Sequence, residues 1–222
     1  MNSLKQKVKV CAVIPFYNEI DFLSDVVSEI LYFVDNIIAV NDGSTDGSEK
    51  TISNFDSVQI VNLDRNYGKG YALQKGFDES LKSNYDVVIT LDADKQHNPA
   101  SIPDFFSKLD KFDIAVGNRL NDTKNMPFQR ILSNKITSAL LSLKTGQKIL
   151  DSQCGYRAYK TEVLKKVKSF SFGYEAESEM IVYAARAGFK IGFVNISTIY
   201  GDEKSKMNPI NAILGFIKIL FK

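Results

Sequence analysis

Residues 85–97, YDVVITLDADKQH, decide how this chain folds. The run VVIT is typical of a strand buried on both faces of a sheet, and it leads into the polar side chains of Asp92, Asp94 and Gln96. Alternate residues of an extended segment point the same way, so these side chains can present oxygen atoms to one side. Oxygen ligands suit Mg²⁺ or Mn²⁺, and a diphosphate commonly completes such a site. The alternative is a capped turn before a helix opened by Pro99.

The composition is that of a soluble globular protein. The chain has 222 residues, 44% hydrophobic and 24% charged, which is enough for one domain of good size. A net charge of +2 gives no reason to expect nucleic acid as a partner. Cys11 and Cys154 form no motif, and the first residues lack the apolar core of a secretory leader. We therefore expect a reduced, cytoplasmic protein without disulfides and without a membrane-spanning helix.

Strand and helix patterns alternate through the first half of the chain. Strands are predicted at 8–14, 36–40, 58–62, 85–91 and 113–116, and helices at 19–33, 46–55, 69–83 and 99–109. This alternation predicts an α/β fold with βαβ units on a mostly parallel sheet. Ligands of such sheets bind at the carboxyl ends of the strands, so the residues that follow each strand are the candidate binding residues.

Three of these strand ends carry groups that suit a nucleotide. After the first strand, Tyr17 offers a stacking face, and Asn18 or Glu19 can accept from a ribose hydroxyl or a base. After the second, Asp42 can bond a base or ribose, although helix capping explains part of that polar stretch. After the third, Lys69 begins a helix, where a cation is unfavourable unless an anion neutralises it. We therefore expect Lys69 to contact phosphate.

Four segments in this order resemble the family 2 glycosyltransferases, which have the GT-A fold: PFYNE at 15–19, NDGSTD at 41–46, NYGKG at 66–70 and DADKQH at 92–97. Asn41 stands where the family's second motif usually has its first aspartate. The resemblance implies a Rossmann-like, mostly parallel sheet flanked by helices. It also implies that the nucleotide is held by Pro15, Tyr17, Glu19 and Asp42, and the metal and diphosphate by Asp92, Asp94 and Gln96.

The second half is similar to the dolichol-phosphate mannosyltransferase branch of that family, which loads a sugar onto a polyprenyl phosphate. The similarity lies in GNRL at 117–120, RILSN at 130–134, DSQCGYR at 151–157, GY at 173–174, EM at 179–180 and YGDEKSK at 200–206. In that branch two arginines and a serine grip the lipid phosphate. Arg119 and Arg130 match the arginines, and Asn134 stands where the serine usually is. The branch's late arginine is missing, which leaves Lys204 and Lys206 for the diphosphate.

The identity of the acceptor decides whether a general base is needed. A phosphate acceptor is already an anion, so Arg119 and Arg130 would only have to orient it for a direct, inverting displacement. A sugar hydroxyl would need a carboxylate base. The candidate bases are Asp151, Glu177 and Glu179.

Different arguments favour Glu177 and Glu179 as the base. Helical periodicity places Glu177 on the buried stripe of its helix and Glu179 opposite it, whereas the resemblance matches Glu179 to the branch's glutamate. Either could instead form a structural ion pair with Arg157 or Arg186.

Two helices have an apolar face that suits a bilayer surface. The first covers residues 128–143 and carries Arg130 and Lys135; packing on the sheet or on a partner subunit is the alternative. The second begins at Pro209 and reaches residue 222 with lysines for lipid head groups. For this second helix a membrane or oligomer contact is favoured, because an apolar chain end has little else to bury it.

These observations predict one GT-A domain over residues 1–222, with a nucleotide-sugar-binding half at 8–117, an acceptor-binding half at 118–207 and an amphipathic helix at 208–222. The predicted activity is a metal-dependent, inverting transfer of a hexose from a GDP-mannose or UDP-glucose type donor to polyprenyl phosphate. The protein is expected to be peripheral, at the cytoplasmic face of the membrane, with a homo-oligomer or a membrane-protein partner left open. Two alternatives remain: a saccharide hydroxyl acceptor in cell-surface polysaccharide synthesis, and a non-catalytic nucleotide-sugar-binding protein.

Overall fold

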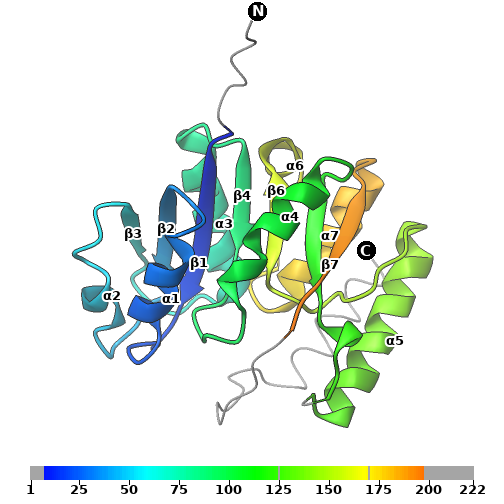
Figure 1. The fold of residues 1–222 in the computed structure, drawn as a ribbon, viewed down its shortest axis with the longest axis horizontal. Helices are drawn as coiled ribbons and strands as arrows, with labels where there is room; N and C mark the ends of the chain where they lie inside the picture. The colour runs from blue at the N-terminus through cyan, green and yellow to red at the C-terminus, as the bar shows by residue number, and fades with distance from the viewer. Residues whose placement is uncertain (1–7, 125, 170, 198–222) are drawn as a thin grey trace, which may run out of the picture.

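A computed structural model describes residues 8–124, 126–169 and 171–197. Its sheet has the strand order β3-β2-β1-β4-β6-β5-β7 within these residues (Figure 1). The strands are β1 (Val10–Phe16), β2 (Asn36–Asn41), β3 (Val58–Asn62), β4 (Val87–Thr90), β5 (Ile114–Asn118), β6 (Arg157–Lys160) and β7 (Ile191–Asn195). Strand β6 runs antiparallel to both of its neighbours, and every other pair is parallel. The predicted α/β class and mostly parallel sheet are confirmed.

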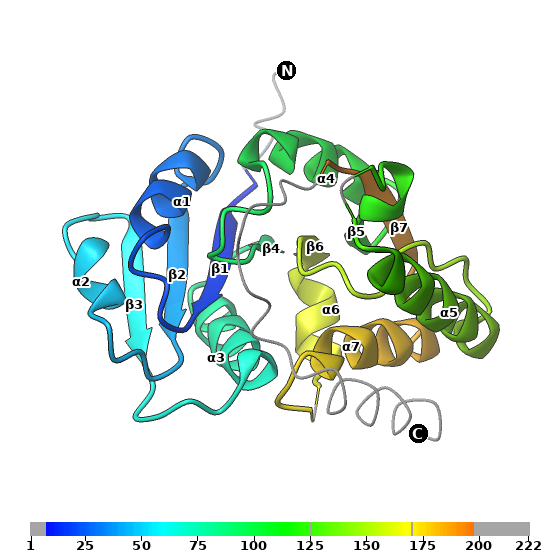
Figure 2. The same ribbon diagram turned by 90° about the horizontal axis from the view of Figure 1, so that it is seen from below.

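Helices cover both faces of the sheet. Figure 2, which looks onto the edge where the parallel strands end, shows α1 and α4 on one face and α3, α6 and α7 on the other. The helices are α1 (Leu23–Ile30), α2 (Ser48–Thr51), α3 (Lys69–Lys82), α4 (Ile102–Leu109), α5 (Phe128–Thr145), α6 (Thr161–Lys166) and α7 (Glu175–Arg186), with 3-10 turns η1 (Pro99–Ser101) and η2 (Arg119–Asn121). Helix α5 lies beside α7 at the β7 end of the molecule.

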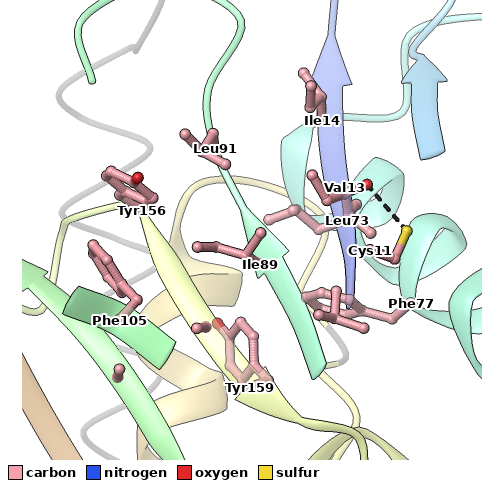
Figure 3. Close-up of a cluster of buried hydrophobic side chains, with 14 of the residues drawn as sticks. Cys11, Val13, Ile14, Leu73, Phe77, Ile89, Leu91, Phe105, Tyr156 and Tyr159 are labelled. Carbon is pink, nitrogen blue, oxygen red and sulfur yellow. Dashed lines mark hydrogen bonds between the residues drawn. The ribbon is translucent and has the colours of Figure 1, made fainter. Parts of the chain in front are cut away.

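The core lies between the central strands and these helices (Figure 3). Strands β1 and β4 are buried along their lengths, as their apolar sequences predict. Phe77 of α3 meets Tyr159 of β6 edge-on at 5.5 Å between ring centroids, and Phe105 of α4 stacks on Tyr156 at 4.2 Å. Each large apolar side chain buried in this way contributes about 1.5–3 kcal/mol. This packing holds the strand ends, and the side chains that follow them, in fixed positions.

Several predicted boundaries differ from the structure. Strand β1 continues through Pro15 to Phe16, because β4 pairs with β1 only as far as Val13 and the missing N–H of Pro15 breaks no bond on that side. Helix α2 is only four residues long, since Gly47 before it adopts a left-handed φ of 87°. Strands β6 and β7 and helix α6 were not predicted.

Candidate functional site

The site forms where β4 ends. Asp92 and Asp94 follow the last strand residue, Thr90, whose hydroxyl donates to the carbonyl oxygen of Gly155 at 2.7 Å. This bond holds the segment before β6 against the end of β4. A Cβ atom on Gly155 would lie 2.7 Å from Nζ of Lys69 and 2.8 Å from Oδ2 of Asp92. Only glycine therefore allows the chain to pass so close to this carboxylate.

Lys69 links three elements of the site. Its Nζ lies 2.6 Å from Oδ1 of Asp92 and 3.1 Å from Oε1 of Glu177, so the start of α3 is joined to β4 and to α7. Burial acts to lower the pKa of Lys69, but the two carboxylates outweigh it and raise the pKa above its usual value. Lys69 is therefore a permanent cation at the base of the site.

The pKa values of the two aspartates are shifted in opposite directions. Burial would raise the pKa of Asp92, but the Lys69 ammonium holds it well below its usual range. Burial and the charge of Asp92 raise the pKa of Asp94 to about 6. Asp94 Oδ1 accepts from the backbone N–H of Gln96 at 3.1 Å, across a turn in which Lys95 has a φ of 60°. The carboxylates crowd negative charge into a partly buried place.

This arrangement fits a hard divalent cation. Within the residues that the structure describes, no group of three or more His, Cys, Asp or Glu side chains could hold a metal ion. The predicted donors remain Asp92, Asp94 and Gln96, and a diphosphate and water would have to complete such a site. The raised pKa of Asp94 marks an excess of negative charge that such a cation would relieve.

His97 lies at the rim of this site. Its Nε2 is 3.8 Å from Oδ2 of Asp92, and its ring packs at 5.3 Å from that of Tyr156. The ring is buried, so it shapes the turn that follows the aspartates.

The loops after β1 and β2 are bound to each other. Asn18 accepts from the N–H of Thr45 at 2.8 Å through its side chain, and its own N–H donates to Ser44 Oγ at 3.0 Å. The N–H of Glu19 donates to Ser48 Oγ at 2.8 Å. These bonds join the loops after β1 and β2, in which Tyr17 is partly exposed, whereas Pro15 is buried in β1.

Asp42 organises the third loop. Its two carboxylate oxygens accept from the backbone N–H groups of Tyr67 and Gly68 at 2.8 and 2.9 Å. Burial raises the pKa of Asp42 despite these bonds. The carboxylate thus fixes the turn from which Lys69 begins α3, a role that the sequence did not indicate; its predicted contact with the nucleotide stays a prediction.

A second cluster of polar residues joins β5, α5 and the loop after α5. Arg119 donates from Nε to Oδ2 of Asp151 at 2.8 Å and from Nη2 to Oδ1 at 3.0 Å. Asn134 Nδ2 donates to the same Oδ1 at 2.7 Å. Asp151 is completely buried, and although burial acts to raise its pKa, Arg119 holds the pKa below its usual range. Arg130 precedes Asn134 by one helical turn and so lies on the same side of α5.

Asp151 therefore holds two of the three predicted lipid-phosphate residues, Arg119 and Asn134. This carboxylate positions Arg119 and Asn134, and its burial leaves it badly placed to act as a base on a substrate.

Glu179 is buried, in contrast to the periodicity that placed it opposite the buried face of its helix. It accepts from Ser169 Oγ at 2.6 Å, from the N–H of Ser171 at 2.9 Å and from the hydroxyl of Tyr183 at 3.0 Å. It holds the segment before Phe172, whose carbonyl accepts from the N–H of Gly70 at 2.7 Å. The first turns of α7 are buried on several sides, so a single buried stripe was the wrong expectation.

Arg157 has a structural role, but through backbone carbonyl oxygens and not through the carboxylate ion pair that the sequence suggested for it. It is fully buried, and its guanidinium donates to the carbonyl oxygens of Cys154 at 2.7 Å, Ser152 at 2.9 Å and Glu177. It therefore bonds the backbone of Glu177, while the side chain of Glu177 pairs with Lys69.

The predictions for Lys204, Lys206 and the helix at 208–222 lie outside the described residues. In the part of the chain that the structure describes, no helix is long and apolar enough to span a membrane.

Comparisons with known proteins show the family to which this chain is similar. The model of the family described as "Glycosyl transferase family 2" matches residues 11–168. A UDP-N-acetylglucosamine–dolichyl-phosphate N-acetylglucosaminyltransferase of Methanococcus voltae is 31% identical, over 95% of this chain and 92% of that protein. A polyprenol monophosphomannose synthase of Mycolicibacterium smegmatis is 30% identical, over 95% and 85% of the two chains.

The fold also matches a solved structure. Glucosyl-3-phosphoglycerate synthase from Mycobacterium tuberculosis, crystallised with Mn²⁺, uridine diphosphate and phosphoglyceric acid, superimposes with a TM-score of 0.74. The match covers 96% of this chain and 79% of that one at 18% identity. At this identity the likeness speaks for the fold, and it agrees with the predicted GT-A architecture.

Proposed function

Because this chain belongs to glycosyl transferase family 2, we propose that it moves a hexose from a nucleotide diphosphate sugar to a polyprenyl phosphate at the cytoplasmic face of a membrane. The chain is a glycosyltransferase, as its family and its named relatives are. Relatives named for dolichyl phosphate and polyprenol phosphate support the acceptor class. The donor would be of the GDP-mannose or UDP-glucose type, and the complexes of the structural neighbour with uridine diphosphate and Mn²⁺ or Mg²⁺ support a donor bound with a divalent ion.

The observation that carries this proposal is the cluster around Asp151. Its buried carboxylate holds Arg119 and Asn134, two of the three residues that match the lipid-phosphate grip, within hydrogen-bond distance of one group. Asp151 offsets the charge of Arg119, so Arg130 supplies the net positive charge that a phosphate acceptor needs. A neutral saccharide would gain little from such a cluster.

The donor half of the site uses the residues that follow the strands. Asp92, Asp94 and Gln96 would hold Mg²⁺ or Mn²⁺, which supplies Lewis-acid stabilisation of the negative charge on the leaving diphosphate. Lys69 adds a fixed cation at the beginning of α3. Lys204 and Lys206 are proposed for the same diphosphate. The joined loops that contain Tyr17 and Glu19 are proposed to receive the nucleoside.

The acceptor half needs no strong base, because a phosphate is ionised at neutral pH. The three carboxylates that could have served a hydroxyl acceptor are already engaged. Asp151 binds Arg119 and Asn134, Glu179 binds Ser169 and Ser171, and Glu177 faces Lys69. This engagement supports direct attack by a phosphate oxygen and inversion at the anomeric carbon over the saccharide alternative.

A transfer assay tests the acceptor. The purified full chain is incubated with Mn²⁺, labelled UDP- or GDP-sugars, and either undecaprenyl phosphate or a panel of saccharides. We expect label to enter the organic phase only with the lipid phosphate, as an acid-labile product. Label transferred only to a saccharide would establish the rival activity, and binding of the donor without any transfer would leave a non-catalytic protein.

A thermal-shift panel tests the metal and donor residues. We expect Mn²⁺ together with sugars of one base class to raise the melting temperature, and Asp94→Ala to lose this rise. Asp56→Ala, on the exposed surface before β3, is the matched control and should keep it. An equal rise in Asp94→Ala would remove Asp94 from the metal site.

A further inference from the structure

Tyr174 places an aromatic ring beside the proposed metal and phosphate groups. It lies directly before α7, three residues before Glu177. The ammonium nitrogen of Lys69 lies 5.9 Å from the centroid of the Tyr174 ring. Burial raises the pKa of Tyr174, Lys69 opposes this rise, and the negative charge of Asp92 adds to it. The ring therefore stands at the edge of the site, within the electrostatic range of its charged groups.

The backbone before Tyr174 is fastened to the beginning of α3. The carbonyl oxygen of Phe172 accepts from the N–H of Gly70 at 2.7 Å. A Cβ atom on Gly70 would lie 2.7 Å from the carbonyl oxygen of Gly173, so glycine is needed for the two segments to approach so closely. Helices α3 and α7 lie side by side on one face of the sheet (Figure 2). The position of Tyr174 is thus fixed relative to the residues at the start of α3.

Packing in the core does not account for the Tyr174 ring. The side chain is 41% exposed. Phe172, two residues earlier, is also exposed, but its ring meets that of Tyr71 edge-on at 5.4 Å between centroids. In the part of the chain that the structure describes, Tyr174 pairs with no other aromatic ring. An open aromatic face next to a few charged groups is a usual feature of a small-molecule site.

The order of the groups in the donor indicates which one meets this ring. In a nucleotide diphosphate sugar the diphosphate lies between the nucleoside and the hexose. The nucleoside is proposed to bind the loops after β1 and β2, and the diphosphate to bind near Asp92, Asp94 and Lys69. The hexose is then the group that is left to lie against Tyr174. One face of a hexopyranose consists largely of C–H groups, whose slightly positive hydrogens suit the negative face of an aromatic ring.

We propose that Tyr174 forms one side of the hexose subsite and stacks on the C–H face of the donor sugar. This inference deepens the proposed function and rests on its donor half. The alternative role for Tyr174 is to hold Lys69 through the attraction of its ring for the cation. The two roles differ in what they predict. Stacking on the hexose affects only ligands that carry a sugar, whereas support of Lys69 affects every ligand that carries a diphosphate.

A comparison of ligands with and without the sugar tests this role. UDP and UDP-glucose, and GDP and GDP-mannose, are titrated calorimetrically into the full chain with Mn²⁺, and the pair that binds is followed across variants. We expect Tyr174→Ala to weaken binding of the nucleotide sugar about three- to tenfold and binding of the nucleoside diphosphate less than about twofold. Tyr174→Phe, which keeps the ring, should bind both ligands like the unsubstituted chain.

Two further variants control for effects on the fold. Tyr174→Leu keeps apolar volume without an aromatic face, and it should repeat the selective loss seen with Tyr174→Ala. Phe172→Ala is the matched control, because it removes an exposed ring from the same segment, and it should leave both affinities unchanged. The melting temperature of each variant is measured in parallel.

Equal weakening of both ligands by Tyr174→Ala and Tyr174→Leu would overturn the inference and leave Tyr174 as a support for Lys69. Unchanged binding of the nucleotide sugar by these variants would overturn it as well. If neither ligand pair binds, the donor half of the proposed function is wrong and this inference is wrong with it. If the selective loss is found but no sugar reaches polyprenyl phosphate, the inference stands and only the proposed acceptor is wrong.

Discussion

The ammonium nitrogen of Lys69 lies 2.6 Å from Oδ1 of Asp92. This pair joins the first residue of α3 to the turn after β4, and it occurs at a helix start, where a lysine is normally unfavourable. The neighbouring carboxylates explain how the cation is tolerated there. Because of this ion pair, Lys69 already occupies one side of the Asp92 carboxylate, which is proposed to hold a divalent ion.

Removing Lys69 should therefore destabilise the protein in a way that a cation can repair. Lys69→Met leaves Asp92 and Glu177 partly buried without their partner, and we expect a loss of about 2–3 kcal/mol in the free energy of unfolding. Millimolar Mn²⁺ should restore part of this loss, as measured by denaturant unfolding with and without the ion. Lys69→Arg, which keeps the charge, should lose less. A Met variant as stable as the unsubstituted chain would show that the pair contributes nothing.

Gly155→Ala should damage the site without unfolding the protein. The added methyl would lie within 3.0 Å of Lys69 Nζ and of both Asp92 oxygens, so the carboxylate must move. We expect the Mn²⁺-dependent thermal shift by nucleotide sugars to fall while the melting temperature of the free protein changes little. Gly146→Ala is the opposite control: its φ of +67° makes alanine cost about 1–2 kcal/mol, yet the space around it is open. It should lose stability and keep the shift.

The sequence predicted the first half of the fold well because each parallel strand is a buried apolar run followed by a turn. There is a physical reason why strands β6 and β7 were not predicted. Strand β6 is the four-residue segment RAYK, whose buried Arg157 bonds the carbonyl oxygens of Ser152 and Cys154 just before the strand and of Glu177 in α7. Periodicity carries no information on such long-range bonds. The end of β1 was misplaced because β4 stops pairing with β1 at Val13. Pro15 therefore has no partner strand on that side, and the sequence does not reveal where β4 ends.

The sequence indicated which polar residues follow the strands, but it did not indicate which contacts they make. Asp92 and Asp94 stand at a strand end, as the alternating pattern indicated. The pattern did not show that Asp42 bonds the N–H groups before α3, or that Asp151 is fully buried under Arg119. These roles depend on loops that meet only in three dimensions. Acidic residues that looked equivalent in the sequence thus divide into partly exposed groups, which are proposed to bind the metal, and buried groups that position other residues.

Glu177 and Glu179 should behave differently when each is changed. Glu177→Gln removes the charge that faces Lys69, so we expect kcat for sugar transfer to fall roughly 10- to 100-fold with little change in stability. Glu179→Ala leaves Ser169, Ser171 and Tyr183 without their acceptor and should cost about 3 kcal/mol of unfolding free energy. Glu179→Gln should recover part of that cost. The assignment fails if Glu179→Gln abolishes transfer at full stability while Glu177→Gln is fully active.

Both thiols should be unreactive in the folded protein. Cys11 and Cys154 are buried and free, and burial raises the pKa of each thiol to about 12. At pH 8 roughly one thiol in ten thousand would be ionised, and reaction with a disulfide reagent needs the thiolate. We expect a thiol titration to find no reactive group in buffer and two in denaturant. Rapid reaction of either thiol in buffer would show that its side of the core opens.

The Asp151 carboxylate should determine part of the acid stability of the protein. Because Arg119 holds the folded-state pKa of Asp151 below its ordinary value of 3.8, its contribution is complete above that pH and is lost as the pH falls below it. Other carboxylates titrate in the same range, so the informative quantity is the difference between the unsubstituted chain and Asp151→Asn. At pH 7 we expect the variant to be less stable by about 3 kcal/mol, because Arg119 is left without its buried partner.

That difference should shrink as the pH falls below 3.8, because the unfolded chain then binds a proton on Asp151 that the folded chain, with its lower pKa, does not yet bind. Urea unfolding at a series of pH values measures it. Asp56→Asn, which changes an exposed carboxylate, should have the same free energy of unfolding as the unsubstituted chain at every pH. A difference that stays constant, or that grows as the pH falls, would mean that the ion pair with Arg119 does not set the stability of this cluster.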